Sequence, residues 1–352
     1  MNMNAIVVNA NHSAALKKIC GITIVERVVL SIYYAGYKDI RVICDDGNKA
    51  IELKKILDAN PRENLKIVFD PSPVAGSDVV FHADSAINKE HVLSVIKGQD
   101  QPRSINIKIV DEKSVHVAKW ALLNSCRKPG EAISSHYYRY ISLFFTSYLC
   151  ETKVTPNQVS FFFLLIGFVG GVLISLPSPI LYFIGLICQP LAIVFDCVDG
   201  EIARVKYQYT KSGEWLDTVC DNLCTLFFVI GISITNYRLN PTPFDYKLGL
   251  VTTVAYLIAI AMMFITLMKF SDSGSLAVIN ADIRKKGKVA NFFAVLLKRN
   301  VVTLVFMVLG FFYLTRTLLF LNMAGCIGLM IFSISMMSKL RRSVDDSGAD
   351  VV

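Results

Sequence analysis

The chain has 352 residues, of which 53% are hydrophobic, and a formal net charge of +8. Its mean hydropathy is positive, which excludes an ordinary soluble globular protein and is typical of a membrane protein. Charged and apolar stretches alternate up to about residue 130, whereas long apolar runs follow from about residue 155. We therefore expect a soluble head and a membrane body. The positive charge suits anionic lipid headgroups and phosphate substrates, and it does not require a nucleic acid as partner.

The head has the pattern of an α/β domain. Strands are predicted at residues 5–9, 39–44, 66–69 and 78–82, and an amphipathic helix at 22–35. Because strands alternate with helices, we expect a parallel, Rossmann-like sheet. We place this domain at residues 1–125.

A linker and an amphipathic helix are predicted at residues 126–153. The aromatic residues between Tyr137 and Tyr148 suit the headgroup zone of a membrane, and a linker helix packed on the body is the alternative. The body is predicted at 154–342 and a polar tail at 343–352.

The body is expected to be an all-α domain of six membrane spans. They are predicted at residues 156–176, 179–203, 214–236, 247–269, 299–315 and 317–339. Lys and Arg concentrate in alternate connections, so the positive-inside rule places the head, the even-numbered loops and the C-terminus in the cytoplasm. The first residues lack the basic-then-apolar run of a secretory signal, and we expect the spans themselves to direct insertion.

Four aspartates are concentrated around the second and third spans. Asp196 and Asp199 share one helical face, and Gly213, Asp217 and Asp221 share a face of the next helix. Charged groups at a membrane are costly, so such a group indicates a functional site, here at the cytoplasmic end of the two spans. Their mutual repulsion would raise their pKa values unless cations lay between them.

Two other interpretations of the acids remain open. The first is a set of structural ion pairs with Arg204, Lys206 and Lys211, which leaves the helical phasing and the glycines at 200 and 213 unexplained. The second is a cation-coupled membrane transporter, for which acids spread over several depths are expected. In this sequence the acids are grouped at one depth of the predicted membrane spans.

The acids belong to a longer pattern. The string D-x-x-D-G-x-x-A-R from Asp196 to Arg204, followed after eight residues by G-x-x-x-D-x-x-x-D, resembles the signature of the CDP-alcohol phosphotransferase (phosphatidyltransferase) family. Residues 155–160 resemble the family's opening of the first span, with Ser160 where Thr is more common. The resemblance implies six spans. It also implies an enzyme that moves a phosphoalcohol group from a CDP-alcohol to an alcohol and releases CMP, in phospholipid or polyol-phosphodiester synthesis.

The resemblance also implies roles for individual residues. The four aspartates would bind two metal ions, which as hard cations with oxygen ligands suit Mg²⁺ or Mn²⁺. Asp221 would be the catalytic base that deprotonates the alcohol. The CDP donor, a lipid or a polyol derivative, would contact Asn157, Ser160, Gly200, Ala203, Arg204, Thr210 and Gly213.

The acceptor, an alcohol or polyol phosphate, requires cations if it carries a phosphate. Arg284 and Arg299 are the candidates, and Arg299 resembles an arginine that family members keep ahead of the fifth span. Gly167 and Gly171 form a small-xxx-small pair that suits close helix packing or a homodimer. The sequence does not identify the alcohol of the donor or that of the acceptor.

The head carries a second resemblance. Residues 16–28, with the run Glu26-Arg27-Val28, resemble sugar-phosphate nucleotidyltransferases, and Asp84 follows a strand like the one that ends in their metal-binding aspartate. The segment 9–16 contains neither the Gly nor the Arg of a loop that cradles a triphosphate. We expect a degenerate domain, and a bifunctional enzyme whose head makes the CDP-alcohol from CTP is the alternative. The layout resembles fusions of a cytidylyltransferase with a di-inositol-phosphate synthase.

Overall fold

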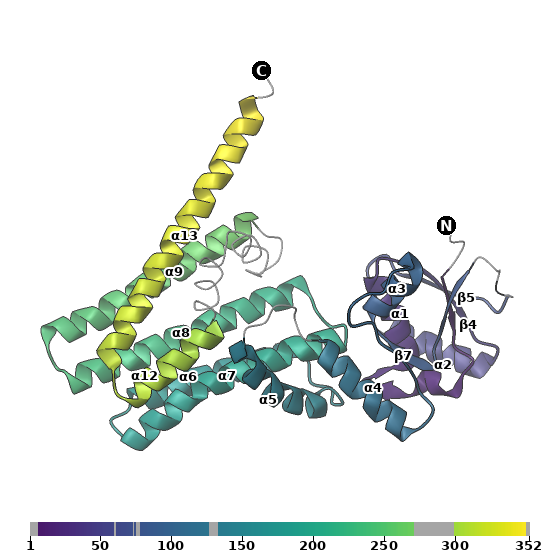
Figure 1. Ribbon diagram of the computed structural model, residues 1–352, viewed down its shortest axis with the longest axis horizontal. Coiled ribbons are helices and arrows are strands. Elements are labelled where there is room, and N and C mark those ends of the chain that lie inside the picture. The colour runs from purple at the N-terminus through teal and green to yellow at the C-terminus, as the bar shows by residue number, and fades with distance from the viewer. Residues whose placement is uncertain are drawn as a thin grey trace. The chain divides into compact units, whose positions relative to one another are not determined.

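The computed structural model of the protein describes residues 6–59, 61–72, 74, 78–126, 133–270 and 299–349 (Figure 1). Its contacts divide the chain into two compact units. The head unit comprises the described residues of 1–129, 143–154 and 201–208, and the helical unit comprises those of the remaining segments. Helices α5 (Ile133–Leu149) and α7 (Pro179–Val205) therefore contribute residues to both units.

The head unit contains the predicted parallel sheet. Four strands rich in β-branched residues pair in the order β5-β4-β1-β6, and every pairing is parallel. The prediction of a Rossmann-like α/β domain is thus confirmed. The strands are β1 (Ile6–Asn9), β4 (Asp39–Ile43), β5 (Lys66–Phe69) and β6 (Val79–His82).

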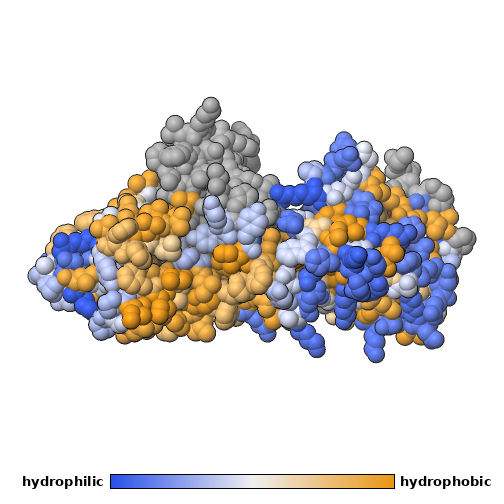
Figure 2. Space-filling view, turned by 60° about the horizontal axis from the view of Figure 1, so that its bottom comes forward, coloured by the Kyte–Doolittle hydropathy of each residue, from blue (hydrophilic) through white to orange (hydrophobic). Residues whose placement is uncertain are grey.

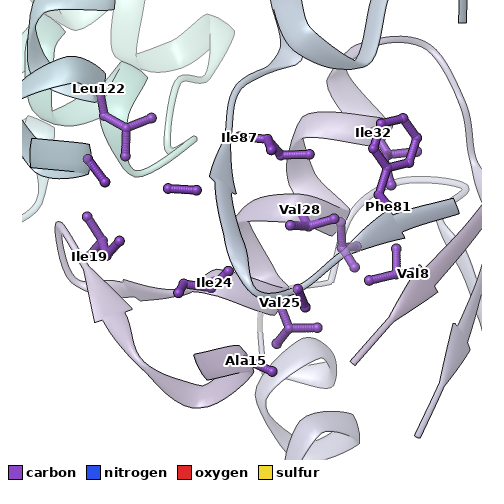
Figure 3. Packing of buried hydrophobic residues seen from close by; sticks show 14 of the residues in the cluster. Val8, Ala15, Ile19, Ile24, Val25, Val28, Ile32, Phe81, Ile87 and Leu122 are labelled. Carbon is purple, nitrogen blue, oxygen red and sulfur yellow. The ribbon is translucent and has the colours of Figure 1, made fainter. Parts of the chain in front are cut away.

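Helix α1 (Ile24–Tyr34) is the central element of the head core. It starts two residues later than predicted, because Ile22 and Thr23 form a strand and the Thr23 hydroxyl accepts the N–H of Glu26 as the helix cap. Figure 3 shows Val28 and Ile32 of α1 near Phe81 of β6. Burial of each such side chain contributes about 1.5–3 kcal/mol to the stability of the head.

The other head elements surround this core. Two short antiparallel pairs join β2 to β3 and β7 to β8. Helices α3 and α4 follow strands β7 and β8 in the chain. The bounds are η1 (Ser13–Leu16), β2 (Lys18–Ile19), β3 (Ile22–Thr23), α2 (Gly47–Asp58), β7 (Ser85–Ile87), α3 (Lys89–Lys97), β8 (Asn106–Lys108) and α4 (Glu112–Ser125).

The helical unit contains six helices that correspond to the six predicted spans. Among the described residues, five helices are long and apolar enough to cross a membrane, and a shorter apolar helix covers 301–311. The predicted span at 299–315 is shorter than expected because Tyr313 adopts a left-handed backbone (φ 54°) and ends that helix. The helices are α6 (Pro156–Ser175), α7, α8 (Lys211–Leu239), α9 (Pro243–Phe270), α12 (Arg299–Phe311) and α13 (Thr315–Ala349).

Apolar side chains dominate the visible surface of the helical unit (Figure 2). Exposed residues of α6 include Phe161, Leu165 and Phe168, which would be unfavourable in water and are expected against lipid chains. The protein is therefore an integral membrane protein. In helix α5 the exposed side chains include Tyr137 and Tyr148, whereas the buried ones include the polar Ser142 and Thr146. The place of this helix in the membrane interface stays a prediction.

Helices α6 and α8 approach each other through glycines. A Cβ atom at Gly167 would lie 2.5 Å from Sγ of Cys224, and one at Gly171 would lie 2.6 Å from the carbonyl oxygen of Phe227. From the opposite helix, a Cβ at Gly231 would lie 2.5 Å from the carbonyl oxygen of Gly171. The small-xxx-small pair thus serves packing within the chain, and these contacts do not support the homodimer.

An ion pair between a buried aspartate and a half-exposed arginine connects α9 and α13. Both carboxylate oxygens of Asp245 accept hydrogen bonds from the Arg316 guanidinium, each at 2.6 Å. Asn236 of α8 also donates to Asp245, at 3.1 Å. The aspartate is fully buried, so its charge depends on these donors.

Candidate active site

Three of the four predicted metal ligands lie together in the helical unit. Asp196 comes from α7, and Asp217 and Asp221 come from successive turns of α8. One carboxylate oxygen from each lies within 4.8 Å of those of the other two. All three side chains are half-buried. The helical phasing predicted from sequence therefore does bring acids of two helices to one place.

The fourth acid, Asp199, is held from a third helix. It is only 4% exposed, and its carboxylate accepts a hydrogen bond of 2.6 Å from the hydroxyl of Ser160 on α6. Ser160 is equally buried. Asp199 lies about one helical turn after Asp196 on α7, and this hydrogen bond fixes the orientation of its carboxylate. Its carboxylate is not among the three that lie within 4.8 Å of one another, so its role as a metal ligand stays a prediction.

Three predicted donor-binding residues also lie together, at the starts of α6 and α8. Thr210 caps α8, because its hydroxyl accepts the N–H of Gly213 at 3.0 Å. A Cβ atom at Gly213 would lie 3.0 Å from that hydroxyl and 3.5 Å from the side-chain oxygen of Asn157. Glycine thus keeps the space between these two polar side chains open. The start of a helix also favours an anionic group through its free N–H groups.

Of the other predicted donor contacts, Ser160 is the α6 residue that binds Asp199, and the remaining three occupy the last turns of α7. Gly200 belongs to the helical unit, whereas Ala203 and Arg204 belong to the segment 201–208 of the head unit. Nε of Arg204 is buried and has no hydrogen-bond partner among the described residues. A guanidinium in this state is suited to bind an anionic ligand.

Asp221 also lines a pocket in the helical unit. This small pocket is surrounded by residues of α6, α7, α8 and α12. Its polar lining comes from Asp221, Gln189, Thr225 and Thr303. Sequence reasoning missed Gln189 and Thr303, because they belong to no motif; polar residues within apolar spans are the signal that points to them.

The two predicted acceptor-phosphate residues are not placed by the structure. Arg284 lies outside the described residues. Arg299 is the first residue of α12, but the structure does not describe its side chain. Binding of the acceptor by these arginines stays a prediction.

Side chains of the head itself form hydrogen bonds with the segment that follows β1. The Lys49 ammonium donates to the carbonyl oxygens of Ala10 and His12, each at 2.7 Å. Asn11 donates to Asp45 at 2.7 Å. These contacts occupy the edge of the sheet where a nucleotide binds in folds of this type.

Asp84, which resembles a metal-binding aspartate, lies at the same edge and pairs with a lysine. Its carboxylate lies 3.4 Å from the Lys108 ammonium. Partial burial acts to raise the pKa of Asp84, but the Ser85 hydroxyl and Lys108 outweigh it and hold the pKa below its usual value. The carboxylate is therefore charged at neutral pH, with its charge balanced by the protein.

Comparison with known families decides the identity of the membrane body. The sequence model of the family described as CDP-alcohol phosphatidyltransferase matches residues 153–336, which is just over half of the chain. The chain belongs to this family. The description is that of a transferase of phosphate-containing groups, and the family generally uses divalent metal ions.

Two curated relatives match this member of the CDP-alcohol phosphatidyltransferase family over shorter stretches of sequence. A bifunctional IPC transferase and DIPP synthase of Aquifex aeolicus is 33% identical over 102 residues, covering 29% of this chain and 23% of the relative. A protein of the same name from Thermococcus kodakarensis is 35% identical over 91 residues, covering 25% and 19%. The matches thus span less than a quarter of the length of either relative.

Proposed function

We propose that the protein transfers a phosphoalcohol group from a CDP-alcohol to an alcohol acceptor and releases CMP, with the acids of α7 and α8 as the catalytic centre. The observation that carries this proposal is the convergence of Asp196, Asp217 and Asp221 within 4.8 Å in a chain of this family. The grouping of Asn157, Thr210 and Gly213 at the starts of α6 and α8 supports the proposal, with these residues as part of the donor site.

The acids fit divalent metal ions. Three carboxylates so close together repel one another, and oxygen ligands of this kind suit Mg²⁺ or Mn²⁺. We propose that Asp196, Asp199, Asp217 and Asp221 hold two such ions. When bound, the ions would neutralise the diphosphate charge and orient the reacting groups.

The protein's own residues then have the following roles. The acceptor hydroxyl oxygen forms a bond to the phosphorus that carries the donor's alcohol, and the bond from that phosphorus to the bridging oxygen of CMP breaks. Asp221 takes the hydroxyl proton, and CMP leaves with the electron pair of the broken bond. Arg204 holds a diphosphate oxygen. Ser160 keeps Asp199 oriented through their hydrogen bond.

We further propose that the active site faces the cytoplasm and that residues 1–125, 126–153 and 154–342 act as head, linker helix and transferase domain. The basic connections support the orientation. Both relatives bear the name DIPP synthase, which supports polyol-type donors and acceptors beside lipid ones. We propose that the head makes no CDP-alcohol, because Lys49 closes the segment after β1.

The test is CMP release by the purified protein in detergent with Mg²⁺ or Mn²⁺. CDP-diacylglycerol and CDP-polyols serve as donors, and polyols, inositol phosphate and glycerol phosphate as acceptors. We expect CMP from at least one pair, and loss of it in Asp221→Asn. Glu214→Gln is the control, because Glu214 is an exposed acid of the same helix. Turnover in Asp221→Asn equal to that of the control would exclude Asp221 as the base. Cation flux in liposomes without CMP from any pair would favour the transporter instead.

The head is tested separately with CTP and polyol phosphates. We expect no pyrophosphate from the full chain. If the full chain releases pyrophosphate and a substitution of Lys49 alters the rate of that release, the head is a working cytidylyltransferase.

A further inference from the structure

The C-terminal end of α7 is held by an arginine from the start of the chain. Arg27 of α1 is only 1% exposed. Its Nη1 donates to the carbonyl oxygen of Val205 at 3.0 Å, and its Nη2 donates to that of Ile19 at 2.8 Å. All three residues belong to the head unit. The guanidinium thus bridges the β2–β3 hairpin and the last residue of α7.

A buried charge at this position has a physical reason. Removal of a guanidinium from water costs several kcal/mol, so it must be offset by good hydrogen bonds. The last carbonyls of a helix lack partners inside the helix and carry the negative end of its dipole. Val205 is the final residue of α7, and Arg27 supplies both the missing donor and the favourable charge.

Tyr207 holds the turn that follows α7 in an unusual conformation. Its backbone is left-handed (φ 54°), a state that favours glycine, and the N–H of Gln208 closes the turn on the carbonyl of Ala203 at 2.8 Å. A tyrosine keeps this conformation only when its surroundings determine it. Here the Tyr207 hydroxyl shares a 2.8 Å hydrogen bond with Ser31 of α1, and its ring stacks on Tyr34 at 5.4 Å.

Two further side chains, those of Arg62 and Lys206, hold the same segment. Arg62 of the head donates to the carbonyl oxygen of Tyr207 at 2.7 Å. The Lys206 ammonium is buried and donates to the carbonyls of Thr152 and Val154, at 2.7 and 3.1 Å. Each residue from 205 to 207 is therefore fixed by the head unit.

This segment connects Arg204 with Thr210, two of the proposed donor contacts. We infer that the head serves as a positioning scaffold for the CDP-donor segment, with Arg27 and the Ser31–Tyr207 pair as positioning residues. The inference rests on the proposed function, in which Arg204 and Thr210 bind the CDP group. It gives the head a function in the transferase reaction without any nucleotide chemistry of its own.

The test compares Arg27→Met with Lys49→Met in the full-length protein. Lys49 is a matched control, because its cation also bridges two head carbonyls, and among the described residues these hydrogen bonds go to Ala10 and His12 and not to the segment 201–208. We expect Arg27→Met to raise the KM for the CDP donor about tenfold, with the acceptor KM unchanged. We expect Lys49→Met to change neither constant. A folded Arg27→Met protein with the donor KM of wild type would overturn the inference.

A second readout does not depend on activity. Hydrogen exchange of the amides of residues 204–210 should accelerate about ten- to hundredfold in Arg27→Met and stay unchanged in Lys49→Met. If Arg27→Met does not fold, Tyr207→Phe removes only the hydroxyl that Ser31 contacts and should accelerate the same amides to a smaller extent. Unchanged exchange in Tyr207→Phe would then overturn the inference. Failure of the wild type to release CMP would refute the proposed function but leave the exchange result standing.

Discussion

Replacement of Gly171 by alanine tests whether the α6–α8 contact sets the geometry of the acidic cluster. The new methyl group would lie 2.6 Å from the carbonyl oxygen of Phe227, about 0.8 Å less than an ordinary contact of 3.4 Å. The neighbouring atoms are backbone atoms of α8, so one helix must shift. Overpacking of this kind costs about 1–3 kcal/mol. Asp221 lies less than two turns from Phe227 on α8, and a shift of about 1 Å costs about 100-fold in rate.

The assay combines thermal melting in detergent with CMP release. Gly325→Ala is the matched control, because a Cβ at Gly325 meets no atom within 4 Å. In a helix interior, alanine stabilises the helix by about 1 kcal/mol relative to glycine. The control variant measures this stabilisation without the steric clash. We expect Gly171→Ala to melt at a lower temperature than the control and to lose most of its turnover. Equal melting and turnover in the two variants would refute the role of the glycine contact.

Three further predictions concern hydrogen bonds. Ser160→Ala removes the donor to Asp199 and should lower turnover or metal affinity about 10- to 100-fold, measured by CMP release against Mn²⁺ concentration. Arg316→Gln leaves the buried Asp245 carboxylate without its charged partner and should lower the melting temperature markedly. Asp111 caps α4, and hydrogen bonds from the backbone N–H and the hydroxyl of the third helical residue hold its pKa below the usual value. Its contribution to stability is present above about pH 4 and is lost as pH falls through the lowered pKa, so Asp111→Ala should lower the melting temperature at pH 7 but little near pH 3.

The Ser160 and Arg316 variants each have a control, and the Asp111 variant is compared at the two pH values. Ser160→Thr keeps the hydroxyl and should retain turnover. Lys247→Gln removes an exposed cation of α9 and should leave the melting temperature unchanged. For Asp111, an equal loss of stability at both pH values would show that its charge makes no contribution.

The fold was largely predictable because its signals are local. Runs of β-branched residues predicted all four strands of the sheet within one residue, and the apolar runs predicted the long helices. The start of α1 was predicted too early, because Ile22 and Thr23 pair with the neighbouring strand β2 in a short hairpin, and the apolar pattern of residues 22–35 does not show this pairing. The Asp245–Arg316 pair was missed for a related reason, since the two residues lie 71 positions apart and outside the predicted span cores.

The site was predictable only where its residues share a motif. The phasing of Asp196, Asp217 and Asp221 follows from helical geometry, and the structure brings them together. The contact of Arg27 with Val205 joins residues 178 positions apart and leaves no periodic signal in the sequence. The sequence likewise does not show that Asp199 is held by Ser160, because spacing alone cannot tell which helix faces it.

The central claim is that the acids of α7 and α8 form a metal-dependent transferase centre. The most direct measurement is CMP release as a function of Mn²⁺ concentration for the wild type and for Asp217→Asn. We expect no CMP after treatment of the wild type with a chelator, a saturable recovery with Mn²⁺, and at least about a tenfold weaker response in Asp217→Asn. CMP release that survives chelation, or that responds to Mn²⁺ equally in both proteins, would contradict the central claim.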